Sequence, residues 1–491
     1  MKLAAFSAAL LAGLAFASAA QAQWEEVYGA QPHFDEGHRR VTPVTQCPSR
    51  GYIAIGTRDV GSAGGGPYVT VVRTDNGGAT IWEGVYDVGH DGQIDEGFSL
   101  VELKDGTGFV TTGTSFDGSQ WHAHAMKLNC DGKVLRSNFY VIPGFGGYYR
   151  LVGHDIREAQ SGDGVTTNAG DLLIAGYVDD ISWQSDAVLL RLDAGLNLVW
   201  HRRYDTGVNE RFYGLTETKP TYAATGDIAA VGTYGTFWGL DQALVARVDG
   251  LTGGLGGPDH CFAEYGDGGY EDFQSIVETQ TWPDTGALTM AGRSTSPGLN
   301  DDVYLVQTKT NPCSMRAQVT IGNETGDPFF ERATDLIEVL HPINPFLGVP
   351  VGSFALTGAA ETKYSPSDAF LLFVKPSSLH PITARRYGDH RDRVDFGTSL
   401  QQNDPFGPQG PGFILAGTTL TDWDGSGDPG DLYLIQPNDG AKTGCQEDWK
   451  PDGVDQPWHP VSHDPHIDKF VRQVRVSVKY GFDDTVYQVC H

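Results

Sequence analysis

One short stretch recurs along this chain and constrains its fold more than any other feature. A glycine is followed by a few apolar or small residues and then by Gly-Thr, most clearly in Gly51–Thr57, Gly108–Thr114 and Gly412–Thr418. Less exact copies begin at Gly170, Gly226, Gly286 and Gly352. The starts follow one another at roughly 55–65 residues, a period that predicts a repeat architecture rather than a set of unrelated domains.

Each repeat contains four short runs that are rich in β-branched and aromatic residues. In the first full repeat these runs are Phe98–Leu103, Gly108–Thr114, His122–Leu128 and Val134–Tyr140. Such runs, separated by Gly, Asn and Asp, predict a meander of four antiparallel strands. One sheet of this size cannot bury its own faces, but seven sheets packed around an axis can. The sequence therefore predicts an all-β, seven-bladed β-propeller, with a linear solenoid as the competing architecture.

Two details of the repeat predict how the blades are built and closed. The glycine of the Gly-Thr stretch predicts a close backbone approach at the inner end of each sheet. Trp24–Gly29 matches the outer-strand endings Tyr265-Gly266 and Tyr387-Gly388. We therefore expect the N-terminal strand to complete the last blade, which removes two exposed sheet edges.

The repeat resembles that of secreted bacterial β-propeller proteins. Units of that family read roughly Asp-Ala-Phe/Tyr-Leu-Val-Lys, then Asn-Gly, then Trp, then Tyr-Gly-Gly. Asp368–Lys375 and Tyr387–Asp392 carry the resemblance, which covers about residues 24–440, although His122 and Tyr68 stand where the family has Asp. The resemblance implies the propeller fold and an exported protein, but no single activity, because propellers host many functions.

The ends of the chain differ from the repeats. Residues 1–22 have a basic start, an apolar run and small residues at Ala20 and Ala22, which predicts a signal peptide that is removed on export. That run is short and no later stretch could span a bilayer, so no membrane span is expected. Residues 23–440 are assigned to the propeller. In residues 441–491, alternation within Val471–Tyr480 and the run Thr485–Val489 predict a C-terminal β-hairpin docked on it.

The charge balance restricts the partners. Lys+Arg 34 against Asp+Glu 62 gives a net charge of -28, which repels nucleic acid and anionic lipid. A secreted, cell-surface or periplasmic monomer is expected.

The even number of cysteines predicts three disulfides in an oxidising compartment. In an up-and-down blade, the loops between strands one and two and between strands three and four share one face. Five of the cysteines map to that face, and the sixth ends the tail, which is therefore expected to cross the face. Cys261–Cys313, on neighbouring blades, is the favoured pairing. The six candidates are Cys47, Cys130, Cys261, Cys313, Cys445 and Cys490.

The loops on the opposite face carry aromatic residues beside carboxylates. Flat rings stack on sugar rings and carboxylates accept hydrogen bonds from hydroxyls, so this pattern suits a glycan site. The alternative is that the tryptophans fill gaps between neighbouring blades. The candidate ligand-binding residues are Trp121, Trp183, Trp238, Trp423, Tyr364, Asp180 and Asp302.

Metal sites are weaker candidates. The loop Asp422–Asp431 alternates Asp with Gly and could bind calcium through Asp422, Asp424, Asp428 and Asp431, although an ordinary acidic turn is the alternative. His122 and His124 lie two apart on one strand and could form a metal-ligand pair, but packing is the favoured interpretation.

No catalytic motif is evident, because Gly-x-Ser-x-Gly, the P-loop and His-Glu-x-x-His are all missing from the sequence. The favoured function is a binding or scaffold module for a glycan or a cell-surface protein, more in keeping with a non-enzyme. The alternative is a glycoside hydrolase or lyase that uses carboxylates on the tryptophan-bearing face.

Overall fold

A computed structural model provides the coordinates of the chain. The residues that it describes are 24–28, 35–59, 66–89, 92–142, 149–159, 170–180, 184–218, 226–235, 241–257, 260–266, 269–281, 283–295, 301–309, 314–322, 330–343, 347–361, 367–387, 394–404, 412–420, 431–437, 461–463, 471–473, 477–480 and 486–489. Within these residues the regular structure is almost entirely β-strand.

The strands form successive four-stranded antiparallel meanders. The first half of the chain supplies β2 (Asp35–Val44), β3 (Gly51–Asp59), β4 (Pro67–Thr74) and β5 (Thr80–Tyr86); β6 (Asp95–Glu102), β7 (Phe109–Phe116), β8 (Trp121–Leu128) and β9 (Val134–Tyr140); β10 (Arg150–Glu158), β11 (Leu172–Asp179), β12 (Ser185–Leu192) and β13 (Leu198–Asp205). The meanders β6–β9 and β10–β13 are joined by one parallel pairing between β8 and β10.

The second half continues the same pattern. Its strands are β14 (Asn209–Thr218), β15 (Asp227–Gly235), β16 (Gln242–Asp249) and β17 (Cys261–Tyr265); β18 (Tyr270–Glu278), β19 (Leu288–Thr295), β20 (Asp301–Thr308) and β21 (Met315–Gly322); β22 (Glu331–Glu338), β23 (Phe354–Ala360), β24 (Asp368–Val374) and β25 (Pro381–Tyr387); β26 (Val394–Gln402), β27 (Phe413–Leu420) and β28 (Asp431–Gln436). The outer partner of β28 is β1 (Trp24–Tyr28), which pairs with it antiparallel from Trp24↔Gln436 to Tyr28↔Leu432.

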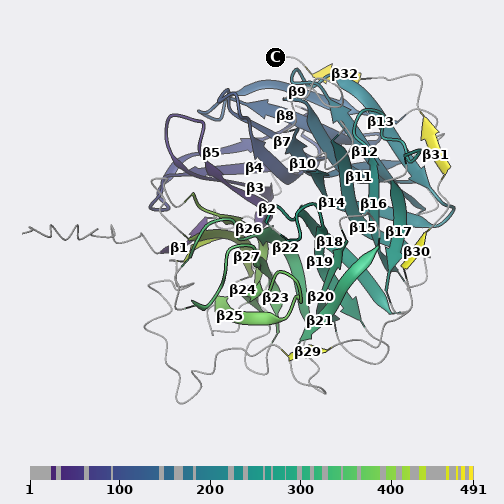
Figure 1. The fold of residues 1–491 in the computed structure, drawn as a ribbon. Coiled ribbons are helices and arrows are strands. Elements are labelled where there is room, and N and C mark those ends of the chain that lie inside the picture. Colours follow the sequence, from purple (N-terminus) through teal and green to yellow (C-terminus); the bar gives the residue numbers. More distant parts are fainter. Residues whose placement is uncertain are drawn as a thin grey trace, which may run out of the picture.

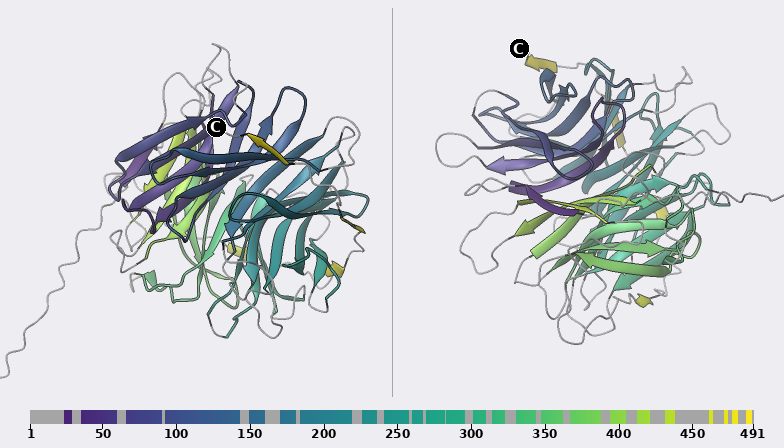
Figure 2. Two further views of the ribbon diagram at one scale, coloured as in Figure 1. Left: turned by 90° about the horizontal axis from the view of Figure 1, so that it is seen from above. Right: turned by 90° about the vertical axis from the view of Figure 1, so that its left-hand side faces the viewer.

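The sheets are arranged as in a β-propeller (Figures 1 and 2). The first strand of each meander, called the inner strand, contacts the first strand of the next, from β2 through β6, β10, β14, β18 and β22 to β26, and β26 contacts β2. Hydrophobic clusters fill the space between neighbouring sheets. One cluster, for example, joins Ala123 and Tyr140 of one sheet to Leu151 and Leu190 of the next.

The repeated glycines lie where neighbouring strands of one sheet come too close for a side chain. Gly108 has φ +140°, and a Cβ there would lie 2.0 Å from the carbonyl oxygen of Leu128. Gly113, the second glycine of that copy, has no room either, because a Cβ would lie 1.8 Å from the carbonyl oxygen of Glu96. The predicted close approach is therefore confirmed, and only glycine fits both positions.

A β-bulge interrupts the inner strands at the same point, opposite the second glycine of the repeat. Its register shifts lie between Gly97 and Ser99 in β6 and between Gly153 and Asp155 in β10. The same shift recurs in β14, β18, β22 and β26. A bulge inserts one unpaired residue and bends the strand, so it turns the following side chain towards the neighbouring inner strands.

The inner strands are also linked by carboxylates at their far ends. Glu102 accepts hydrogen bonds from the backbone N–H of Thr45, Gln46 and Cys47, in the loop that follows β2. Glu338 binds the loop after β18 in the same way. Each glutamate thus fastens its own sheet to the preceding one by charge-assisted hydrogen bonds.

The C-terminal hairpin prediction was wrong. The tail contributes β29 (Val461–His463), β30 (Val471–Gln473), β31 (Ser477–Tyr480) and β32 (Val486–Val489), which pair with β21, β17, β13 and β9 respectively. These short strands, yellow in Figure 1, lie along the outer edges of four sheets and not across one face. The physical reason is that each outer strand offers unpaired N–H and C=O groups, whereas an isolated hairpin is only marginally stable.

One predicted feature of the cysteines appears directly. Cys47, after β2, forms a disulfide with Cys130, in the turn between β8 and β9, with the Cα atoms 5.7 Å apart. Cys261 is also in a disulfide. Cys313, Cys445 and Cys490 lie outside the described residues, so the Cys261–Cys313 pairing stays a prediction.

Candidate functional site

The predicted site residues divide into two groups. Those outside the described part of the chain are Trp183, Trp238, Trp423, Tyr364, Asp422, Asp424 and Asp428. Trp121, Asp180 and Asp302 are described and half-buried, and Asp431 is the first residue of β28. The calcium prediction therefore stays a prediction.

Trp121 lies at the junction of two sheets. Its ring is 5.1 Å from that of Phe116, and the guanidinium of Arg150 lies 5.0 Å from the ring centre. Arg150 belongs to the next sheet, so Trp121 is partly enclosed between sheets. Asp180 serves its own turn, in which its carboxylate accepts a hydrogen bond of 3.0 Å from the backbone N–H of Gln184.

The face that carries Trp121 also carries four arginines that lie over aromatic rings. This set, the arginine rim, stands where the inner strands begin, at the end opposite the Cys47–Cys130 disulfide. The guanidinium-to-ring distances are 5.0 Å for Arg150 on Trp121, 4.7 Å for Arg211 on Tyr177, 4.3 Å for Arg293 on Tyr270 and 5.4 Å for Arg332 on Phe396. Such cation–π contacts fix the direction of each arginine while leaving its edge able to bind a ligand.

Two rim arginines, Arg150 and Arg211, are neutralised by one carboxylate each. Arg150 pairs with Glu96 at 2.9 Å, and Arg211 pairs with Asp179 at 3.2 Å. Both keep about a third of their side-chain surface exposed, 36% and 35%. They can therefore donate further hydrogen bonds to a ligand at the surface.

Arg293 carries two ion pairs. Its Nε lies 2.8 Å from Asp272, and one terminal nitrogen lies 3.1 Å from Asp301. Tyr270, beneath it, is half-buried, and burial raises the pKa of its hydroxyl. Because Arg293 has two carboxylates, its charge is fully compensated by the protein.

Arg332 differs from the other three. It is exposed and lies over Phe396, yet it forms no ion pair with any residue that the structure describes. Burial of its environment lowers the pKa of Arg332, and the charge of Arg293 lowers it further. The guanidinium stays charged at neutral pH and has donors to spare.

Three carboxyl groups near the rim have raised pKa values, each chiefly because burial disfavours the charged form. Glu210, whose pKa is raised to about 8, and Asp272 are fully buried, so neither can touch a ligand at the surface. Asp241 is half-buried, and its pKa is raised as well. It is the accessible carboxyl of the three.

Below the rim, polar side chains cross-link the inner strands just after their bulges. Asp335 accepts hydrogen bonds from Ser275 at 2.8 Å and Ser399 at 3.1 Å, and Arg40 lies 3.7 Å away. Asp155 accepts one from Ser99 at 2.8 Å. These carboxylates are buried and satisfied by neighbouring strands, so they hold the inner strands together.

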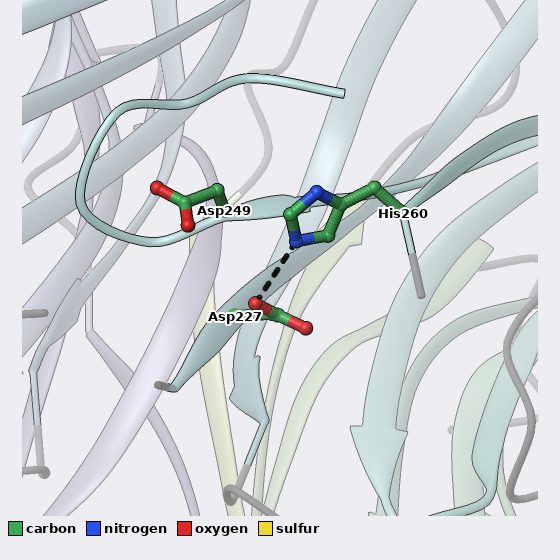
Figure 3. A group of neighbouring side chains, drawn as sticks. All are labelled: Asp227, Asp249 and His260. Carbon is green, nitrogen blue, oxygen red and sulfur yellow. Dashed lines mark hydrogen bonds and ion pairs between the residues drawn. The ribbon is translucent and has the colours of Figure 1, made fainter. Parts of the chain in front are cut away.

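Near the opposite end, Asp227, Asp249 and His260 form a compact group (Figure 3). Their potential ligand atoms lie within 4.8 Å of one another. The backbone N–H of Gly257 donates to Nδ1 of His260, so the proton of a neutral ring is on Nε2, which points at Asp227 at 3.2 Å. A metal would need that nitrogen unprotonated.

The carboxylates of this group are also engaged. Asp227 accepts a hydrogen bond of 2.9 Å from Nε of Arg247, and Asp249 accepts two from Thr252 at 2.7 and 2.8 Å. The geometry fits a hydrogen-bonded turn better than a metal centre.

The histidine pair has packing partners. His122 hydrogen-bonds Asp117 at 2.7 Å, and buried His124 hydrogen-bonds Ser115 at 2.9 Å. Burial lowers the pKa of His124 to about 3. The rings of His122 and His124 thus form hydrogen bonds with different residues.

Sequence reasoning did not identify the arginine rim or the polar layer beneath it. The sequence does carry a signal for the polar layer, because a Ser or Asp recurs at one position of the predicted first strand. These residues are Ser99, Asp155, Ser275, Asp335 and Ser399. The rim arginines come from two different strands of the repeat, so no single spacing reveals them.

Comparisons with known proteins add little beyond the fold. No protein-family model matches the sequence, and no curated protein is significantly similar to it. Structural similarities include a glucose dehydrogenase (11% identity, TM-score 0.38, covering 69% of this chain and 96% of that one). They also include the soluble aldose sugar dehydrogenase of Escherichia coli (10% identity, TM-score 0.37, covering 70% of this chain and 96% of that one). A third is the WD40 domain of SCAP from fission yeast (9% identity, TM-score 0.35, covering 84% of this chain and 98% of that one).

At these TM-scores the similarities carry no argument about activity. None of the described residues forms a helix long and apolar enough to cross a membrane.

Proposed function

We propose that this protein is an exported, monomeric, seven-bladed β-propeller that binds a glycan on the face of the arginine rim. The pairing of β1 with β28 and the contact between β26 and β2 support a ring closed by the N-terminal strand. The signal-like residues 1–22 and the Cys47–Cys130 disulfide support export, because disulfides persist in oxidising compartments.

The observation that carries the binding function is the arginine rim itself. Four guanidiniums held over aromatic rings, three of them beside carboxylates, present donors, acceptors and flat apolar surfaces together. Sugar recognition uses this combination, since hydroxyls need both donors and acceptors and pyranose rings stack on aromatic rings. A protein partner on the same face is the competing ligand.

The test is a glycan array probed with residues 23–491, followed by calorimetry with the best oligosaccharide. We expect Arg211→Ala to weaken binding by roughly tenfold, as the loss of a charged hydrogen-bond donor does. Arg202→Ala is the matched control, because Arg202 lies 5.5 Å over Trp200, away from the rim.

Failure of every glycan to bind, or equal loss of affinity in both variants, would refute the glycan site. Release of reducing or unsaturated ends from a bound polysaccharide would instead favour the hydrolase or lyase. Half-buried Asp241 would then be the first carboxyl to replace.

A further inference from the structure

Arg332 forms no ion pair with any residue that the structure describes. Arg211, Asp272, Arg332 and Phe396 occupy equivalent positions on successive inner strands, each directly before the residue at which the bulge begins. At the first two of these positions the charge is matched, since Arg211 pairs with Asp179 and Asp272 pairs with Arg293. Arg332 faces Ala359 on the paired strand, and alanine offers no counterion.

The nearby carboxylates attract the charge of Arg332 but form no salt bridge with it among the described residues. Asp272 and Asp301 both bind Arg293, at 2.8 and 3.1 Å. Glu361 is close enough to influence the pKa of Arg332, but it forms no salt bridge with it among the described residues. In a chain with 62 acidic and 34 basic residues, an exposed arginine in a carboxylate-rich neighbourhood would ordinarily be paired.

The guanidinium is held in place for a ligand. Phe396 lies under it at 5.4 Å, so one face of the planar group is covered and its edge remains available. The edge of a guanidinium offers two parallel N–H donors that match the two oxygens of a carboxylate.

Resting on the proposed glycan function, we infer that Arg332 binds the carboxylate of a uronic acid residue in the ligand. The partner is an oligosaccharide with an isolated acidic sugar, and not a densely charged polyanion, because the net charge of -28 repels the latter. The sugar ring would then lie beside the arginine rim.

The experiment compares matched probes by calorimetry: the best-binding neutral oligosaccharide, the same oligosaccharide with one glucuronate, and the methyl ester of that glucuronate form. Sodium acetate is the fourth probe. We expect the glucuronate form to bind most tightly and its ester to lose that advantage. Added salt should reduce the difference, since the contact is ionic.

Variants then assign the effect to one side chain. Arg332→Ala should lower the affinity for the glucuronate form by roughly tenfold or more and lower the affinity for the neutral form much less. Arg332→Lys should recover part of the loss, because lysine keeps the charge but not the two parallel donors. Arg50→Ala, an exposed arginine on the opposite face, should have no effect.

The two proposals fail in different ways. Equal binding of the neutral and glucuronate forms, or equal loss of both in Arg332→Ala, would overturn the carboxylate inference and leave glycan binding standing. Binding of acetate alone, with no oligosaccharide bound, would overturn the glycan function.

Discussion

Glu210 shows how far the fold can alter the chemistry of one residue. It is fully buried near the beginning of β14, and burial raises its pKa to about 8, with Asp186 adding to the effect. Its closest partner is Thr206, whose backbone N–H donates at 3.3 Å. The Glu210 carboxyl is thus protonated and forms hydrogen bonds at neutral pH. No pattern in the sequence predicts this protonation.

This raised pKa predicts a pH dependence of stability. The folded chain retains a proton that the unfolded chain releases near the ordinary glutamate pKa, so stability falls as the pH rises from about 5 to 8. Glu210→Gln removes the titration and keeps the shape. We expect the wild-type free energy of unfolding to fall relative to the variant by up to about 1.4 kcal/mol per pH unit.

Urea unfolding of both proteins at several pH values measures this difference, and every other titrating group cancels in the subtraction. Parallel curves across the window would show that Glu210 is charged in the folded state.

At the scale of the strand, the bulge allows polar side chains to cross-link neighbouring inner strands. It lets Asp335 on β22 reach Ser275 on β18, Ser399 on β26 and Arg40 on β2. The same carboxylate accepts from the backbone N–H of Leu400 at 2.9 Å. The Asp335 side chain therefore links its own strand, β22, to three other inner strands, β18, β26 and β2.

Replacing Asp335 should consequently destabilise the whole protein. Asp335→Asn leaves the buried Arg40 without its carboxylate and places amide donors against backbone donors, at a cost of roughly 3–5 kcal/mol. Asp131→Asn, at an exposed turn position, is the control and should change stability little. Chemical denaturation measures both, and equal midpoints would mean that the polar layer contributes nothing to stability.

The strands could be predicted where local chemistry decides them. Gly108 and Gly113 are visible in the sequence because backbone geometry admits no other residue, and their spacing predicts the repeat. The four-stranded meander follows from the runs of β-branched and aromatic residues between the turns. The bulge and the position of Arg332 depend on neighbouring sheets, so the sequence of one repeat does not reveal them. The tail strands are a further case, because the outer edges to which they pair lie far away in sequence.

On the scale of the molecule, the tail acts as an external strap. Its strands pair in turn with β21, β17, β13 and β9, so the chain runs back past four sheets in the order opposite to their synthesis. Each pairing covers an edge that could otherwise pair with another molecule. The tail thus couples sheets that touch mainly through their side chains, and it protects them from self-association.

A chain that ends at residue 440 should test this role. Loss of β29 to β32 exposes four outer edges, so we expect a lower unfolding midpoint, by about 2–4 °C for each kcal/mol lost, and concentration-dependent association. Calorimetry and analytical ultracentrifugation measure the two effects. The full-length Cys445→Ser, Cys490→Ser variant keeps the strands and removes both tail cysteines. If the unfolding midpoint and association of that variant matched those of the truncated chain, the tail would stabilise the protein through its cysteines. If they matched those of the wild type, the added strands themselves would stabilise the sheets.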